Sequence, residues 1–361
     1  MTRIPMLGVR LFDPDQTADV LRQRFLTHLA TLRAAKDPEL AGKPLHPVIL
    51  KSLVGDLTFD ETEKVGRRAL RLVNARNQSR EDGHLKNDDR RALLPLAEGV
   101  NLISIPSEHR ADEIASELHT DMPWMGPANE RVWRVMRSSV REGWMGFRLP
   151  PMLLDGPPGI GKSHWARKLG ELIAAPVMVM DAGNENASFG LVGSQRGWGG
   201  AEPGRLVRCV MRARIANPIV VVDEIEKAGT ATSTRGQAYG LPEAMLPLME
   251  PLTARRWICP YYQVPFDMSW VGWILTSNTA ALLPEPLLSR CPPVHLRHLS
   301  AHELAAFVRR DGGRRDLSET AIEAMAEVLT HPSLRDHRPS LRIAARMLQR
   351  AADLENAPLL H

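Results

Sequence analysis

The sequence predicts an α/β protein in which a parallel sheet is flanked by helices, with a small all-helical domain after it. Two patterns predict this fold. Short apolar runs alternate with helical stretches between residues 109 and 298, as a parallel sheet that is covered on both faces requires. Beyond these runs only helical patterns follow. We therefore expect a mainly helical N-terminal region of unknown role (1–108), a large α/β domain (109–298) and a helical domain (299–361).

The N-terminal region is expected to form short helices separated by turns. Thr17 is a residue type that caps helices. The apolar residues that follow it at helical spacing are Leu21, Phe25, Leu29 and Leu32. A second helix is expected over residues 60–73, and the polar stretch 75–91 is expected to be an exposed loop or linker. No pattern in this region indicates chemistry.

Five apolar runs are expected to be the strands of the sheet. They are short and continuous, which is typical of strands buried on both faces. In chain order they are Pro151–Leu154, Val177–Met180, Ile219–Val222, Val271–Leu275 and Val294–Leu296. In the C-terminal domain, Ser300 and Glu303 form a capping box, Ser318 can cap the next helix, and the apolar face of a third helix begins at Leu341.

Composition narrows the class of protein. Of 361 residues, 43% are hydrophobic and 24% are charged, which excludes a wholly disordered or membrane-embedded chain. The net charge of +4 is small for this length, so charge alone indicates no nucleic-acid partner. Three well-separated cysteines without a CxxC pair argue against disulfides and structural zinc. No signal peptide or run of about 18 apolar residues occurs, so we expect a cytoplasmic protein without a membrane partner.

The strongest motif is GPPGIGKS, which stands between an apolar run and a helical stretch. In such a loop, backbone N–H groups close around phosphates, a lysine reaches the outer phosphates and a hydroxyl coordinates Mg²⁺. Lys162 and Ser163 are the lysine and the hydroxyl here. The nucleotide-binding residues are expected to be Gly156, Pro157, Pro158, Gly159, Ile160, Gly161, Lys162 and Ser163.

Two acidic residues end the third apolar run. We expect Asp223 to hold Mg²⁺ together with Ser163, and Glu224 to polarise the attacking water. By itself, an acidic pair at a strand end is equally consistent with a strand that simply ends at solvent. The phosphate-binding loop that precedes it makes the pair informative.

The order of four motifs resembles that of the AAA+ ATPases. They are GPPGIGKS (156–163), VVVDEIEKA (220–228), WILTSN (273–278) and PEPLLSRC (284–291). The detail is most similar to the ATPase module of Lon-type proteases, in AEPGR (201–205), PLME (247–250) and VPFD (264–267). The resemblance covers residues 110–350. It implies a P-loop NTPase fold with a helical lid, ATP and Mg²⁺ as cofactors, and a homo-oligomer, most often a hexameric ring.

The resemblance also implies roles for single residues. Asn278 looks like the sensor residue that helps to place the attacking water, and Arg290 looks like the arginine finger that reaches ATP bound by a neighbouring subunit. A lid arginine normally contacts the nucleotide of its own subunit. Arg342 is the better match and Arg338 the alternative, while a solvated helix arginine is the simpler interpretation of both.

Trp198 lies in the segment QRGWGG, residues 195–200, where the family has an aromatic loop that lines a central pore and grips polypeptide. A tryptophan packed on the core is the alternative interpretation. The flanking glycines favour a mobile loop, because glycine is conformationally permissive.

Two further segments are less informative. His295, His298 and His302 do not indicate a metal site, because no thiolate or carboxylate ligands cluster with them. The insertion 229–240 is rich in Gly, Thr and Ser and is expected to be a flexible loop beside the active site.

The resemblance implies an ATP-hydrolysing oligomer that remodels or unfolds protein. Lon-type proteases carry a peptidase domain after the lid, whereas this sequence ends at His361. We therefore expect ATPase activity without peptidase activity, and a protein substrate or a separate effector or protease as partner. The alternative function is an ATP-switched scaffold or nucleic-acid-associated regulator without threading activity, although nothing in the charge supports a nucleic-acid partner.

Overall fold

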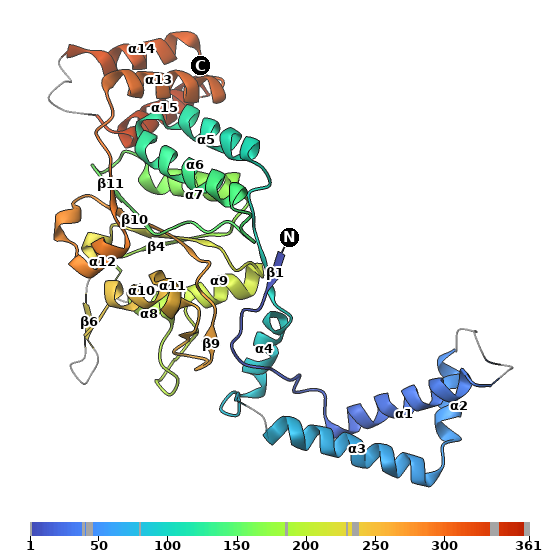
Figure 1. Cartoon of the computed structure of the whole chain (residues 1–361). Helices are drawn as coiled ribbons and strands as arrows, with labels where there is room; N and C mark the ends of the chain where they lie inside the picture. The colour runs from blue at the N-terminus through green and yellow to red at the C-terminus, as the bar shows by residue number, and fades with distance from the viewer. Residues whose placement is uncertain are drawn as a thin grey trace, which may run out of the picture. The chain divides into compact units, whose positions relative to one another are not determined.

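The protein forms two compact units in a computed structural model (Figure 1). The structure describes residues 2–37, 40, 46–78, 81–184, 187–228, 230–232, 238–332 and 339–356. One unit is Leu7–Gly99, and the other is Met1–Met6 with Val100–His361. The division falls at Gly99 and not near residue 108. The reason is that β2 (Val100–Leu102) pairs with β1 (Thr2–Ile4) and is bonded through Asn101 to the α/β part of the chain.

The unit Leu7–Gly99 is helical. Its helices are α1 (Ala18–Ala34), α2 (Pro47–Gly55), α3 (Phe59–Gln78) and α4 (Asn87–Ala97). The helices predicted after Thr17 and over residues 60–73 are confirmed as α1 and α3. The loop predicted over 75–91 is wrong at both ends, because α3 continues to Gln78 and α4 begins at Asn87. Between them, Asp82 is fully buried and accepts a 2.9 Å hydrogen bond from Arg90 Nε, so a polar residue belongs to the packed interior.

A five-stranded parallel sheet forms the centre of the second unit. Its strand order is β11-β3-β10-β5-β4. The strands are β3 (Met152–Asp155), β4 (Val177–Asp181), β5 (Ile219–Asp223), β10 (Gly272–Ser277) and β11 (Pro293–His295). All five predicted strands are confirmed, and all belong to this one sheet.

Helices cover both faces of the sheet, as the apolar runs require (Figure 1). On one face lie α5 (Glu108–Asp121), α6 (Gly126–Arg141) and α7 (Lys162–Leu172), with the turn η1 (Pro123–Met125) between α5 and α6. On the other lie α8 (Ala187–Val192), α9 (Arg205–Ala213), α10 (Leu241–Met249) and α11 (Pro251–Ala254). The apolar sides of these helices pack on the strands, so the hydrophobic core lies between the helices and the sheet. The C-terminal edge of the sheet remains available for a site.

Shorter elements join these layers. They are η2 (Ile225–Lys227), β6 (Thr230–Thr232), β7 (Ala238–Gly240), β8 (Trp257–Ile258), β9 (Pro265–Phe266), η3 (Ala280–Leu282) and α12 (Glu285–Arg290). In the predicted flexible loop 229–240, β6 and β7 pair as an antiparallel hairpin, so the expectation of a loop is wrong there. The rest of that prediction, at residues 229 and 233–237, lies outside the described residues.

The chain ends in a small helical domain with its own apolar core. It consists of α13 (Ala301–Arg314), α14 (Glu319–Thr330) and α15 (Leu341–Glu355), which pack around Leu304, Val308, Leu329 and Leu348. The predicted capping box is confirmed at the start of α13, and Ser318 caps α14 by accepting from Ala321 N. Among the described helices of the whole chain, none has the length and apolar character needed to cross a membrane.

Candidate ATP-binding site

The loop between β3 and α7 has the backbone shape that only glycine adopts readily. Gly159 and Gly161 have φ angles of 75° and 92°, in the left-handed region. A Cβ on Gly156 would lie 2.7 Å from the carbonyl oxygen of Leu296, so the backbone approach there also requires glycine. The loop leads directly into α7, whose first N–H groups and positive dipole end favour an anion. The loop therefore has the shape of a cradle that could hold a phosphate.

Lys162 is held inside this cradle by three hydrogen bonds. Its Nζ donates to the carbonyl oxygens of Gly156 and Pro157 at 2.6 Å and 3.0 Å, and to Asn278 Oδ1 at 2.9 Å. Burial lowers the pKa of the Lys162 ammonium, while nearby carboxylates, Glu226 and Asp223 foremost, act in the opposite direction. The ammonium is thus partly desolvated and paired only with neutral oxygens, which is a favourable starting point for binding phosphate.

Ser163 and Asp223 form an oxygen-rich group at the start of α7. Ser163 Oγ lies 2.8 Å from each carboxylate oxygen of Asp223, and the Thr276 hydroxyl also donates to Asp223 Oδ1. Mg²⁺ prefers hard oxygen ligands such as these. The donor set therefore fits the cation expected from the sequence, which Ser163 and Asp223 would hold.

Glu224 has a strained backbone at the edge of the site. Its φ of 53° lies in the left-handed region, which is uncommon for a residue with a side chain. Its backbone N donates to Thr276 Oγ1 at 3.0 Å, and its carboxylate accepts from Lys227 Nζ at 2.7 Å. The local geometry turns Glu224 out of the strand direction so that it lines the cavity.

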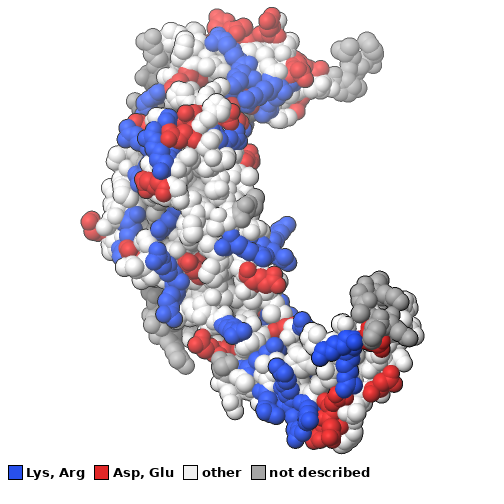
Figure 2. Space-filling view, turned by 45° about the vertical axis from the view of Figure 1, so that its right-hand side comes forward, with Lys and Arg blue, Asp and Glu red and all other residues white. Residues whose placement is uncertain are grey.

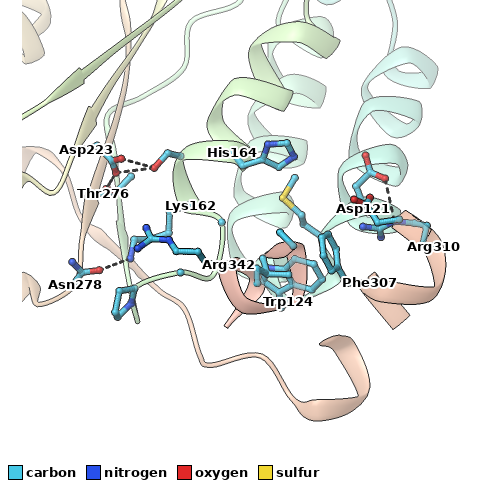
Figure 3. Close-up of a pocket in the computed structure, with 18 of the residues that line it drawn as sticks. Asp121, Trp124, Lys162, His164, Asp223, Thr276, Asn278, Phe307, Arg310 and Arg342 are labelled. Carbon is cyan, nitrogen blue, oxygen red and sulfur yellow. Dashed lines mark hydrogen bonds and ion pairs between the residues drawn. The ribbon is translucent and has the colours of Figure 1, made fainter. Parts of the chain in front are cut away.

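Asn278 follows β10 and connects two charged groups. Its Oδ1 accepts from Lys162, and its Nδ2 and backbone N both donate to Glu226 Oε1, at 2.9 Å and 3.0 Å. The predicted sensor residue thus lies beside the phosphate-binding lysine (Figure 3).

A cavity of about 530 Å³ joins these groups to the helical domain (Figure 3). The α/β side contributes the loop, Lys162, Ser163, Asp223, Glu224 and Asn278. Its lining also includes the apolar side chains of Met122, Trp124, Phe307, Leu341 and Ala345, with Asp121 and Arg310 beside Phe307. Trp124 is fixed there by its Nε1, which donates to Ile160 O at 2.8 Å, and by edge contact with Phe307. One cavity therefore offers charge for phosphates and flat apolar surface for a base.

Three lid arginines also line this cavity. Arg342, at the start of α15, is the predicted lid residue, whereas Arg338 lies outside the described residues. Arg310 and Arg314 of α13 line it too, and the sequence did not single them out. Arg310 donates to Thr120 O at 2.7 Å, and Arg314 donates to Asp121 at 3.0 Å, so both also link the lid to α5.

Arg290 and Trp198 are not among the residues that line the cavity. Arg290 ends α12, with its side chain 37% exposed and its Nε 3.7 Å from Glu250. Trp198 is 41% exposed, and its ring contacts Phe189 edge-on at 5.5 Å, beside a separate hollow of about 300 Å³. A finger supplied to another subunit and a pore-lining aromatic would both be accessible in this way.

His295, one of the three histidines considered above, lies beside an aspartate of the sheet. His295 Nδ1 lies 3.1 Å from Asp155 Oδ2, and Asp155 Oδ1 accepts from Ala280 N at 2.9 Å. The Asp155 carboxylate therefore ties β11 and η3 to the strand that precedes the phosphate-binding loop.

Sequence reasoning missed several residues that the structure brings into the site. Thr276 and Glu226 stand inside quoted motifs, two residues from Asn278 and Glu224, and hydrogen-bond to the predicted residues. Trp124 and Arg310 come from segments with no motif. Only the packing of α5, η1 and α13 against the loop places them at the cavity.

The sheet, the glycine-rich loop and the cavity beside it have the arrangement of a P-loop NTPase fold. The family model described as "ATPase family associated with various cellular activities (AAA)" matches residues 152–297. This part of the chain is therefore similar to AAA ATPase domains, and the curated relatives that match it are Lon proteases.

Two curated proteins and one solved structure are among those similar to this chain. Lon protease 2 of Thermus thermophilus is 29% identical over 185 residues, and Lon protease 4 of Sorangium cellulosum is 31% identical over 180 residues. The matches cover 51% and 50% of this chain but 22% of each relative, so the chain spans about a fifth of their length. A solved RuvB mutant of Thermotoga maritima is 19% identical, with a TM-score of 0.41 over 63% of this chain and 62% of that one.

Proposed function

We propose that the protein is an ATP-hydrolysing AAA+ oligomer, a hexameric ring, that remodels or unfolds protein for a separate partner. One observation carries the ATPase part of the proposal. A single cavity collects Lys162, the Ser163–Asp223 pair, Glu224 and Asn278 from the α/β domain, and arginines from the lid. These are the groups that phosphoryl transfer requires, because its catalysis rests on positioning and charge stabilisation.

The phosphate end of the cavity is proposed to bind ATP through the loop and Lys162. On binding, the Lys162 ammonium would exchange its carbonyl and Asn278 contacts for phosphate oxygens, which are stronger acceptors. Ser163 and Asp223 would hold Mg²⁺, which supplies charge neutralisation on the phosphates. Arg342 of the lid, which lines the same cavity, would contact the phosphates as well.

The apolar end is proposed to bind the base. Trp124 and Phe307 offer aromatic surface, and the Arg310 guanidinium lies 5.7 Å from the Phe307 ring centroid. Hydrogen bonds to Ile160 O and Thr120 O hold Trp124 and Arg310 in place. Because Phe307 and Leu341 belong to the lid, a bound base would couple the lid to the α/β domain.

Glu224 is proposed as the general base for water. Its carboxylate is within the cavity and is paired with Lys227, an exposed residue that can release it. Asn278 would hold the same water on its other side. A base must lie within hydrogen-bond reach of the proton that it removes, and both residues line the cavity.

Arg290 is proposed to complete the site of a neighbouring subunit. It does not line the cavity of its own chain, and its contacts to Pro286 and Glu250 are partly exposed. Since an arginine finger acts on charge that develops in the transition state, a single subunit would hydrolyse ATP slowly.

The test is the ATPase rate per chain as a function of protein concentration. For the wild type we expect a rise with concentration. Glu224→Gln and Arg290→Ala should each lose the activity, by ~10³-fold or more for the arginine. Arg309→Ala, which removes an exposed lid arginine paired with Glu323, is the matched control and should behave as the wild type. Hydrolysis that is absent, or that does not depend on Arg290, would contradict the ring motor and favour an ATP-switched scaffold.

A further inference from the structure

Glu226 is a carboxylate beside the active site to which no role has been assigned. It lies in η2, two residues after Glu224, and its Oε1 accepts both hydrogen bonds from Asn278. Its Oε2 is buried and has no hydrogen-bond partner among the described residues. A buried acceptor without a hydrogen-bond partner lowers the stability of the folded protein, so the presence of a carboxylate here requires an explanation.

The partners of Asn278 determine which way its carboxamide faces. The Lys162 ammonium has only donors, so it must face Oδ1, and the Glu226 carboxylate has only acceptors, so it must face Nδ2. The shape of a carboxamide alone does not select one of its two orientations, because its oxygen and nitrogen are nearly the same size. Here two charged neighbours of opposite sign determine it (Figure 3 shows the lysine side).

This orientation matters once phosphate occupies the loop. Lys162 would then turn to the phosphate oxygens, and Asn278 Oδ1 would be left as a free acceptor in the cavity that Glu224 also lines. It can accept one proton of the attacking water while Glu224 accepts the other. With the carboxamide reversed, Nδ2 would face the water as a donor. Asn278 would then offer no acceptor for a proton of the water.

We propose that Glu226 is a positioning residue for Asn278, and that it holds the carboxamide with its acceptor oxygen toward the lysine and the attacking water. This inference rests on the proposed ATPase function. It assigns to Glu226 a role that acts through Asn278, without contact to the nucleotide.

A matched pair of variants isolates the acceptor. Glu226→Met keeps the length of the side chain but removes the acceptor, whereas Glu226→Gln keeps an acceptor oxygen and removes the charge. We expect Glu226→Met to lower kcat by ~10-fold or more, and Glu226→Gln to stay within ~3-fold of the wild type. Affinity for ATP should change little in both, because Lys162 and the loop remain.

The coupling to Asn278 separates positioning from a merely structural role. In an Asn278→Ala background, Glu226→Met should cause no further loss of kcat. Losses that multiply in this background would overturn the proposal, and so would an unchanged kcat in Glu226→Met. Equal losses in Glu226→Met and Glu226→Gln would show that the charge acts by itself, and would overturn it too.

Two further measurements keep the test decisive. If Glu226→Met does not fold, Asn278→Asp takes its place. This change should lower kcat, because two carboxylates then face each other, and adding Glu226→Gln should restore part of the lost kcat. No restoration would overturn the proposal. If the wild type does not hydrolyse ATP, the proposed function fails, and a crystal structure of Glu226→Met decides the inference. In that structure, Asn278 Oδ1 should no longer lie within hydrogen-bond distance of Lys162 Nζ. A contact between these atoms that is retained at 2.9 Å would overturn the inference.

Discussion

Thr276 joins the two acidic residues of the site through one hydroxyl. It donates to Asp223 Oδ1 and accepts from the backbone N of Glu224 at 3.0 Å. Thr276 is fully buried, so no solvent competes for these bonds. The hydroxyl thereby orients the proposed magnesium ligand and helps to hold the left-handed backbone of the proposed base.

Thr276→Val should therefore impair catalysis more than binding. The change keeps the shape but leaves the Glu224 N–H and an Asp223 oxygen without this partner, at a cost of about 1–3 kcal/mol. We expect kcat to fall by ~10-fold or more while ATP affinity stays within ~3-fold. The measurements are steady-state ATPase kinetics and equilibrium binding of ATP.

The control for this change is Thr330→Val, which removes a hydroxyl that bonds only to carbonyl oxygens of its own helix. It should leave ATPase kinetics unchanged. A Thr276→Val protein with wild-type kcat would show that Asp223 and Glu224 are held without the hydroxyl.

At the scale of single elements, α13 begins with the best-defined cap in the lid. Ser300 and Glu303 exchange hydrogen bonds, and Arg297 donates to both carboxylate oxygens of Glu303 at 2.6 Å and 2.7 Å. The Arg297 guanidinium, together with the Ser300 bonds, lowers the pKa of Glu303 from 4.5 to about 2, although partial burial acts in the opposite direction. This cap starts the helix that carries Phe307 and Arg310 to the cavity.

The lowered pKa makes lid stability depend on acidity. Because the folded state favours ionised Glu303, its contribution is present above its ordinary pKa of 4.5 and is lost as the pH falls toward about 2. Glu303→Gln should destabilise the lid by about 0.5–2 kcal/mol at neutral pH. Thermal unfolding measured against pH should show the two proteins converging under acid conditions.

Glu323→Gln provides the comparison for Glu303. Its carboxylate also pairs with an arginine, Arg309, but this pair is exposed and should contribute little. A pH-independent difference between the wild type and Glu303→Gln would mean that the cap acts by shape and not by charge.

At the scale of the molecule, the proposed ATP site and the proposed polypeptide contact lie on different parts of the α/β domain. Trp198 is in the segment between α8 and α9, while the cavity lies between the C-terminal edge of the sheet and the lid. On the face shown in Figure 2, basic side chains lie beside acidic ones over both units. That mixture offers no single-sign field of the kind that favours a nucleic-acid polymer.

Trp198→Ala should therefore separate the two activities. ATP hydrolysis should stay within ~2-fold, because the nucleotide site is intact, whereas remodelling of an unfolded or tagged substrate protein should be lost. Trp144→Ala, in a different partly exposed loop, serves as the matched control and should preserve both. Remodelling that survives Trp198→Ala would argue against threading past this residue.

Prediction from the sequence succeeded where a pattern is local. Each of the five strands is a continuous apolar run, and the phosphate-binding loop is one uninterrupted segment. The prediction failed where polar residues are buried in the interior. Asp82 is a polar residue in an apparent linker, yet its ion pair with Arg90 is buried, and hydrophobic pattern alone cannot reveal such a pair.

The sequence by itself determined the order of the strands along the chain, the cradle for phosphate and the acidic pair that follows it, because these depend on neighbouring residues. The tertiary structure decided the sheet order, the cavity wall formed by Trp124, Phe307 and Arg310, and the orientation of Asn278 between Lys162 and Glu226. These depend on contacts between residues far apart in the chain. Such contacts form only when helices pack on the sheet, and no spacing in the sequence encodes them.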